Sequence, residues 1–269
     1  MCRLLEVSRS AFYAWLKRRE SQRTQRRALV AEAVDETFHS YKKRYGAPRI
    51  AVELNENGIE CSLNHVAKLL RERGLRARNG KGFKYRARIE SKTNVADNVL
   101  KREFEASEPN VKWVSDITYI KVGREWLYLA VVMDLFSRKV IGWSLADHMR
   151  EELVLEAFEM AIAKRETRAD TLIHSDRGVQ YRGHDYQSAL QENGIQCSMS
   201  RKGNCWDNAA MEAFFGRLKV ELIYAENYTS VEEAIAGIFE YIEMFYNRKR
   251  RHSAIGYCSP VEFEAQYFN

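Results

Sequence analysis

Residues 111–146 read VKWVSDITYIKVGREWLYLAVVMDLFSRKVIGWSLA, and this stretch decides the fold. It contains three runs of β-branched and aromatic residues, which are enriched in strands. The runs span 111–122, 126–136 and 139–146. The connections between them are short, and short connections join antiparallel neighbours. The stretch therefore predicts an antiparallel meander of three strands.

Downstream of the meander, helical and strand patterns alternate along the chain. The expected elements are a helix from Glu151 to Arg165, the strand TLIHSD (171–176), a helix from Asp185 to Asn193, the strand IQCSMS (195–200) and a helix from Asp207 to Leu222. This order is typical of a ribonuclease-H-like α/β fold, a mixed five-stranded sheet flanked by helices. A further helix, 231–246, leads to a basic tail, NRKRRH.

The residues before the sheet are helical and more basic in character. Ser8 can cap a helix that carries Phe12, Trp15 and Leu16 on one face, but no helix precedes it, so residues 1–22 resemble half of a helix-turn-helix. We therefore expect a further segment upstream. The expected divisions are a partial helix-turn-helix (1–22), a helical DNA-binding domain (23–88), a linker (89–108) and a catalytic core with a C-terminal helix and basic tail (109–269).

Two short helices flank a turn at Gly58 within the second division. The later helix is rich in Lys and Arg, is capped by Ser62 and is stopped by Gly74. The pattern is typical of a helix-turn-helix and also of a small structural bundle. The stretch RARNGKGFKYRAR (76–88) that follows suits a segment that tracks a phosphate backbone, or a solvated linker.

The charge is distributed unevenly between the two parts of the chain. The net charge is +6, but residues 1–90 hold 21 Lys and Arg against 10 Asp and Glu, while the remainder holds 22 against 27. This favours a nucleic acid partner for the front part, with a solvated helical surface as the alternative. The five cysteines have no C-x-x-C spacing, and no apolar run is long enough to span a membrane, so we expect reduced thiols and a cytoplasmic protein.

Three acidic residues stand at points where chemistry is expected. Asp116 lies inside the first strand, where burial requires a compensating cation. Asp176 ends a short strand, at the edge where open α/β sheets place their sites, and Glu212 lies on a helix. Between the two aspartates are 59 residues, and between Asp176 and Glu212 are 35.

These acids and several further motifs resemble an insertion-sequence transposase of the DDE type, encoded by the downstream frame of two-frame elements, with a retroviral-integrase-like core. The motifs are VSRSAFYAW, YGAPRI, DLFSRKVIGW, HSDRGVQY, GNCWDNAAME and YNRKRRHSAIGYCSP, and together they cover nearly the whole chain. The resemblance implies metal-dependent cleavage and transfer of DNA strands at element ends, that is, DNA integration and recombination. Breaking a phosphodiester in line suits two Mg²⁺ ions, about 4 Å apart, held by carboxylates.

The resemblance also implies roles for individual residues. Asp116, Asp176 and Glu212 are the expected catalytic and metal-binding residues for two Mg²⁺ ions, which Mn²⁺ can replace, with Asp116 bridging both. Lys219, seven residues after Glu212 and so on the same helix face, is expected to contact the DNA end. The other expected DNA-contacting residues are Arg201, Lys202, Arg71, Arg73, Arg248 and Arg250.

Other polar residues near these positions receive structural interpretations. His174 is expected to be a core histidine rather than a ligand, because Mg²⁺ prefers oxygen. Asp134 is expected to cap a turn, and Asp207 and Asn208 are expected to cap the helix that carries Glu212.

The expected partners are double-stranded DNA at element ends and targets, other copies of the chain when DNA is bound, and a fused or separate upstream-frame product. The protein is expected to associate with the bacterial nucleoid and with no membrane. One alternative is a non-catalytic DNA-binding regulator, or a partial product of a two-frame element. Another is a nuclease that only hydrolyses, which the helical front region disfavours.

Overall fold

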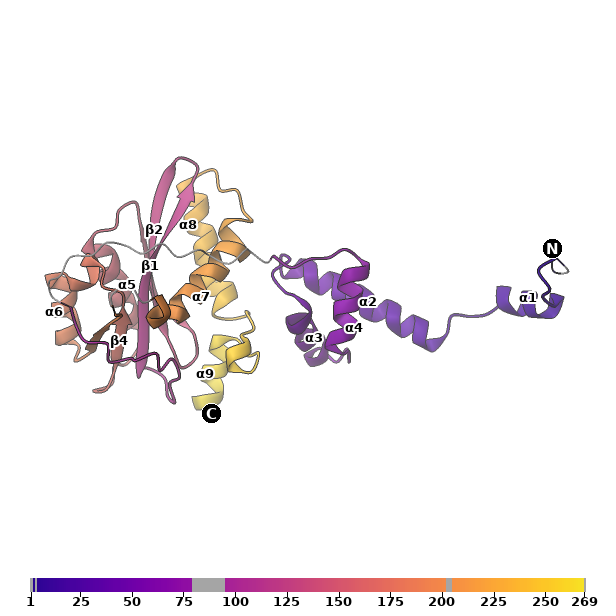
Figure 1. Ribbon diagram of the computed structural model, residues 1–269, viewed down its shortest axis with the longest axis horizontal. Helices are drawn as coiled ribbons and strands as arrows, with labels where there is room; N and C mark the ends of the chain where they lie inside the picture. Colours follow the sequence, from indigo (N-terminus) through magenta and orange to yellow (C-terminus); the bar gives the residue numbers. More distant parts are fainter. Residues whose placement is uncertain (1, 3, 79–94, 202–204, 269) are drawn as a thin grey trace. The chain divides into compact units, whose positions relative to one another are not determined.

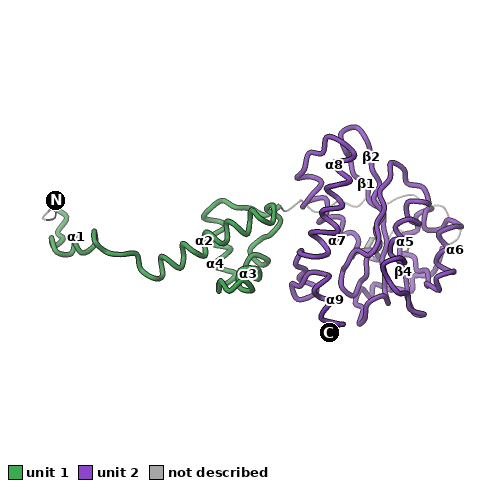
Figure 2. Tube along the Cα trace, turned by 180° about the vertical axis from the view of Figure 1, so that it is seen from behind, with its two compact units in different colours: residues 1–78 green, residues 79–269 purple. Residues whose placement is uncertain are grey.

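The computed structural model describes residue 2 and residues 4–78, 95–201 and 205–268. The chain divides into two compact units, Met1–Arg78 and Asn79–Asn269 (Figure 2). Most of the basic stretch 76–88, from residue 79 onward, lies outside the described residues. None of the described helices is both long enough and apolar enough to cross a membrane.

The first unit consists of four helices. α1 (Arg9–Leu16) begins at Ser8, whose Oγ accepts a hydrogen bond from Ala11 N at 3.1 Å, as the sequence predicts. α2 (Gln22–Ser40), α3 (Ala47–Glu56) and α4 (Leu63–Glu72) pack together, whereas no α1 residue is buried. Their shared core contains Val30, Val34, Phe38, Ile50, Leu54, Val66 and Leu69, each at most 2% exposed.

The second unit is built on a five-stranded sheet in the order β3-β2-β1-β4-β5. β1 (Lys112–Val122), β2 (Glu125–Asp134) and β3 (Val140–Ala146) form the predicted antiparallel meander. β4 (Leu172–Ser175) and β5 (Gln196–Met199) add in parallel to β1. The mixed five-stranded sheet inferred from the sequence is therefore confirmed.

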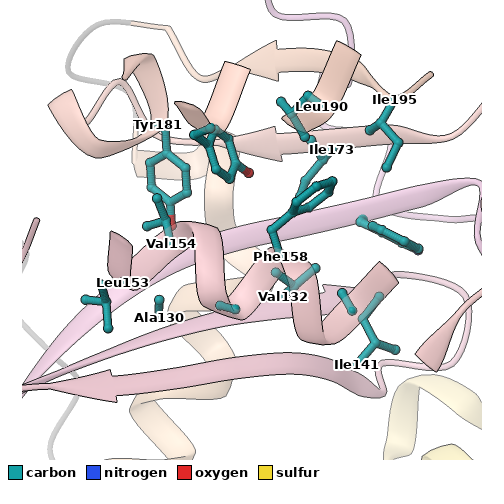
Figure 3. Close-up of a cluster of buried hydrophobic side chains, with 14 of the residues drawn as sticks. Ala130, Val132, Ile141, Leu153, Val154, Phe158, Ile173, Tyr181, Leu190 and Ile195 are labelled. Atoms are coloured by element: carbon teal, nitrogen blue, oxygen red, sulfur yellow. The ribbon is translucent and has the colours of Figure 1, made fainter. Parts of the chain in front are cut away.

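Helices cover both faces of this sheet (Figure 1). α5 (Glu151–Lys164) and α6 (His184–Glu192) lie on one side, where Figure 3 shows the buried side chains of α5 against β2 and β3. On the other side lie α7 (Ala209–Leu218), α8 (Val231–Phe239) and α9 (Pro260–Phe268). α7 continues into a π-helical turn, Lys219–Ile223, and α8 into a π-helical segment, Glu240–Tyr246.

Residues 95–108, expected to be the end of a linker, instead lie against the sheet. Leu100 is 1% exposed, and the backbone N–H groups of Val99 and Leu100 donate to Ser198 Oγ in β5 at 2.9 and 3.2 Å. From residue 95 onward the chain is therefore part of the second unit.

α5 approaches β3 closely at one glycine. A Cβ built on Gly142 would lie 2.8 Å from the backbone nitrogen of Ala161 and 3.0 Å from its Cβ. Both atoms belong to α5, so making room for an added methyl group would require the whole helix to move. The absence of a side chain at Gly142 thus sets the distance between helix and sheet.

We predict that Gly142→Ala lowers the free energy of unfolding of the second unit by roughly 1–3 kcal/mol, because the added methyl group overpacks this contact. Gly216→Ala is the matched control, since a Cβ on Gly216, inside α7, would meet no atom of the described residues within 4 Å apart from the backbone of its own helix. The control should be neutral or stabilising by up to about 1 kcal/mol, because alanine is the better helix former. Urea denaturation of both variants measures the difference, and equal stabilities would contradict the prediction.

Candidate active site

The register of the two parallel central strands places two aspartates side by side. Val114 of β1 lies opposite His174 of β4, and Asp116 and Asp176 each follow two residues further along. Neighbouring strands are about 4.8 Å apart, and residues two positions apart point to the same face. Both carboxyl groups therefore emerge together where β4 ends.

Backbone donors orient both carboxylates. Asp116 Oδ1 accepts a hydrogen bond from Ile117 N, and Asp176 Oδ1 accepts one from Gly178 N, each at 2.8 Å. A Cβ on Gly178 would lie 2.8 Å from that same Asp176 oxygen. The turn after β4 therefore needs a glycine to bring its N–H group onto the carboxylate.

A buried tyrosine lies within reach of both acids. Tyr181 is 1% exposed, and its hydroxyl lies 3.0 Å from Ser115 Oγ. Burial raises the pKa of Tyr181 well above its ordinary value, and the charges of Asp116 and Asp176 raise it further. The sequence analysis quoted this tyrosine within HSDRGVQY but gave it no role, and its position five residues after Asp176 is the only sequence signal for it.

Glu212 lies in the first turn of α7, and its side chain is exposed. The neighbouring protein still removes part of the water around its carboxyl group, which raises the pKa of Glu212. α7 packs against β1, and Asn208 Nδ2 at its start donates to Ser115 O at 3.5 Å, next to Asp116. Among the described residues, however, no three Asp, Glu, His or Cys side chains form a group that could hold a metal ion. The structure thus brings the two aspartates together and places Glu212 on the neighbouring helix without closing the triad.

Lys219 supplies a positive charge near Asp116. The residue is 6% exposed, and its ammonium lies over the Tyr119 ring, 4.6 Å from the ring centroid. Burial lowers the pKa of Lys219, and the charge of Asp116 opposes that shift. Although Lys219 follows Glu212 by nearly two helical turns, Glu212 is exposed and Lys219 is covered.

The chain matches known families along most of its length. A model of the integrase core domain matches residues 106–205, a second integrase core model matches 212–268, and a model of an HTH-like domain matches 24–82. The transposase InsF for insertion sequence IS3A of Escherichia coli (strain K12) is 45% identical over 269 residues, 98% of this chain and 92% of that protein. The chain belongs to the IS3 family of transposases.

A second relative and a solved structure are also similar to the chain. The insertion element IS600 uncharacterized 31 kDa protein of Shigella sonnei is 39% identical over 267 residues, 99% of the transposase chain and 98% of that protein. The cryoEM structure of the simian T-cell lymphotropic virus intasome in complex with PP2A regulatory subunit B56 gamma superposes with a TM-score of 0.50 at 17% identity. The match covers 85% of the transposase chain and 73% of that chain. At this identity the likeness shows a shared fold.

Asp207 does not cap α7, and that prediction is wrong. Asn208 is the N-cap and makes no side-chain capping hydrogen bond. Asp207 is fully buried and accepts hydrogen bonds from Arg102 Nε at 2.8 Å, Asn98 Nδ2 at 2.8 Å and the Arg201 backbone and guanidinium at 2.9–3.0 Å. The hydrogen bonds from Arg201 and Arg102 hold the pKa of Asp207 well below its ordinary value.

His174 is a core histidine in the transposase, as expected. It is 0% exposed, and Nδ1 lies 2.8 Å from Ser198 Oγ. Burial lowers the pKa of His174 to about 4, with the charge of Asp207 opposing the shift. The imidazole is therefore neutral at pH 7.

Arg250 has to be removed from the expected DNA-contacting residues. It is 3% exposed, and its Nε and Nη2 donate to the two carboxylate oxygens of Glu221 at 2.9 and 2.6 Å. Glu221 is 2% exposed and also accepts a hydrogen bond from Tyr241. A guanidinium that is buried and bound in this way cannot reach a phosphate, so Arg250 stabilises the fold.

The remaining expected DNA-contacting residues differ in their surroundings. Arg201 is half-exposed but pairs with Asp207, and Lys202 lies outside the described residues. Arg248 and Arg71 are exposed, and Arg73 is exposed but lies 3.4 Å from Asp35 in α2. Their contacts with DNA stay predictions.

Asp134 holds the turn after β2, as expected. Its carboxylate accepts hydrogen bonds from Asn110 N at 2.8 Å and Phe136 N at 3.0 Å. Burial nevertheless raises the pKa of Asp134 to about 6, since the side chain is 0% exposed.

We predict that Asp134 makes the second unit less stable as the pH rises from about 4 to about 6. The folded chain holds the Asp134 proton up to about pH 6, whereas the unfolded chain releases it near 3.8. The contribution is therefore fully present below 3.8 and is lost on passing through 6, at no more than about 1.4 kcal/mol per pH unit. Asp134→Asn cannot titrate, so urea denaturation across this range should show the stability difference, transposase minus variant, falling with pH. A difference independent of pH would refute the assignment.

We predict that Arg250→Ala lowers the free energy of unfolding by about 3–5 kcal/mol, because it leaves Glu221 buried without its partner. Arg248→Ala removes the same charge from the surface two residues away and should change stability by no more than about 0.5 kcal/mol. Chemical denaturation followed by tryptophan fluorescence compares the two. A mild effect at Arg250 would mean that the buried pair is not formed in solution.

Proposed function

We propose that this transposase cleaves and joins DNA strands at the ends of an insertion sequence, using Asp116, Asp176 and Glu212 to hold divalent metal ions. The observation that carries the proposal is the β1–β4 register, which sets Asp116 and Asp176 beside each other at the open end of the sheet. Two carboxylates forced together in a fold that also carries an HTH-like domain suit a metal-dependent enzyme acting on DNA.

The side chains at this position fit Mg²⁺ or Mn²⁺. Both ions are hard and prefer oxygen ligands, and the two aspartates supply oxygens, whereas the nearby His174 is buried against Ser198. The Lys219 ammonium supports the same idea, because it lies near enough to Asp116 for the charge of that carboxylate to raise the pKa of Lys219. Two bound metal ions would activate the attacking oxygen and stabilise the leaving oxygen of an in-line displacement.

Glu212 would complete the site from α7. It lies one helical turn after Asn208, which is tied to the backbone beside Asp116, and it is exposed enough to change rotamer. Asp116, Asp176 and Glu212 would together hold the ions through their carboxylate oxygens. Closing the triad requires Glu212 to turn towards the aspartates, because the described residues do not hold the three acids as one group.

Lys219 and Tyr181 would support the carboxylates in two different ways. Lys219 could exchange its contact with the Tyr119 ring for a contact with a DNA phosphate. Tyr181, through Ser115, keeps β1 and the turn after β4 in fixed relation and keeps its proton, because its pKa is raised. Neither side chain needs to form a covalent bond to DNA, since water and a DNA 3′-hydroxyl can serve in turn as nucleophile.

We predict that Asp116→Asn, Asp176→Asn and Glu212→Gln each reduce strand cleavage and joining by at least about 100-fold, more than loss of a group that merely supports a ligand. Glu192→Gln is the control, because Glu192 is an exposed acid at the end of α6. The assay uses a labelled element-end duplex with Mg²⁺ or Mn²⁺, and DNA binding is measured in parallel.

Retained DNA binding with lost chemistry in the three variants supports the site. An intact chain that binds the duplex but never cuts it, even when fused to an upstream segment, would instead make the protein a DNA-binding regulator. Unchanged cleavage in any one of the three variants would remove that residue from the site.

A further inference from the structure

A pocket of about 430 Å³ opens in the first unit between α2 and the beginning of α4. Its charged lining comes from Arg23, Arg26, Arg27, Glu60 and Lys68. Four of these five side chains are cationic, so the pocket carries an excess of three positive charges. This concentration of charge makes an anion the natural occupant.

The lining residues are brought together by helical spacing. Arg23, Arg26, Arg27 and Val30 follow the i, i+3, i+4, i+7 pattern of one helix face, and His65 and Lys68 are three residues apart on α4. Val30 is 2% exposed, whereas the three arginines and Lys68 are exposed. The pocket therefore has an apolar floor and a rim of cations that are accessible to a ligand.

The ion pairs at this rim are weak enough to be exchanged. Arg26 lies 3.3 Å from Glu60, with side chains 66% and 86% exposed, and Arg27 lies 2.7 Å from Glu72, with side chains 52% and 42% exposed. Pairs that are exposed in this way are worth no more than about 1 kcal/mol. A phosphate can therefore replace Glu60 at Arg26, or Glu72 at Arg27, at little cost.

We propose that this α2–α4 pocket binds the phosphate backbone of double-stranded DNA and is the main electrostatic contact of the first unit. The inference rests on the proposed function, which makes DNA the substrate. It moves the expected contact from Arg71 and Arg73, at the end of α4, to its beginning and to α2. Arg73 has an acidic neighbour, Asp35, just as Arg26, Arg27 and Lys68 do, so the difference is that the pocket combines four cations in one concave surface.

DNA is the favoured occupant rather than an acidic protein segment. The helix-turn-helix-like pair α3 and α4 presents the beginning of α4 beside the pocket, and the HTH-like match covers residues 24–82. In helix-turn-helix proteins the beginning of the second helix approaches the DNA. A contact to phosphates there positions the helix without reading the sequence.

The test is the salt dependence of DNA binding by the full chain, measured by fluorescence anisotropy between 50 and 200 mM salt without divalent metal. The pocket variant is Arg23→Gln/Lys68→Gln, and the control is Lys42→Gln/Lys43→Gln, which removes the same charge from the exposed turn after α2. All four residues are exposed, so both variants should fold. Arg23→Lys/Lys68→Arg keeps the charges and should restore binding.

In a plot of the logarithm of the DNA-binding constant against the logarithm of the salt concentration, we expect the pocket variant to have a less steep slope than the parent chain. The magnitude of the slope should fall by about two, one for each lost phosphate contact. The fold-loss in affinity should be the same for an element-end duplex and for a shuffled duplex, because phosphate contacts carry no sequence information. The control should keep the slope of the parent chain. Circular dichroism verifies that each variant is folded.

An unchanged slope in the pocket variant, or an equal loss in the control, would overturn the proposal. The test is independent of the catalytic assignment, because binding is measured without metal and without cleavage. If Glu212→Gln left cleavage intact but the pocket variant showed the expected smaller salt dependence, Glu212 would be removed from the catalytic site and the pocket would be supported. The reverse pair of results would overturn the pocket alone.

Discussion

The candidate site depends on one constraint, the parallel register between β1 and β4. β4 has only four residues, and all of them are buried. Ile173 of β4 lies opposite Trp113 of β1, and both side chains are packed in the same core. A slip by one residue would turn Asp116 or Asp176 to the opposite face, so burial of the apolar partners fixes where the carboxylates meet. The hydrogen bond between Ser115 and Tyr181 holds the same alignment from within the core.

Around this register, the buried carboxylate of Asp207 joins segments that are far apart in the sequence. Arg102 and Asn98 reach it from before the sheet, and Arg201 reaches it from the end of β5. Removing any of these donors would leave a buried charge less well compensated, which is costly in a low-dielectric interior. The start of α7, and with it Glu212, is thus held by residues 98–102 as well as by β1.

The sequence was sufficient for the features that repeat locally. The strand runs, the antiparallel meander and the Ser8 and Ser62 caps follow from periodicity and turn residues, and the structure confirms them. Features that depend on distant partners could not be predicted in this way. Asp207 looked like a capping residue because the Asp-Asn pair precedes a helix, and Arg250 looked like part of a basic tail. Their partners, Arg102 and Glu221, lie 105 and 29 residues away.

The division of charge along the chain assigns different tasks to the two units. The strongly positive front part holds the cation-lined pocket, while the remainder has an excess of acids, among them the three of the candidate site. Carboxylates repel a phosphate backbone, so the second unit gains little by attracting DNA on its own. In the proposed function its approach to DNA requires cations, either metal ions on the aspartates or lysine and arginine side chains such as Lys219. Long-range attraction therefore belongs to the first unit, and the second unit engages the backbone only where cations neutralise its acids.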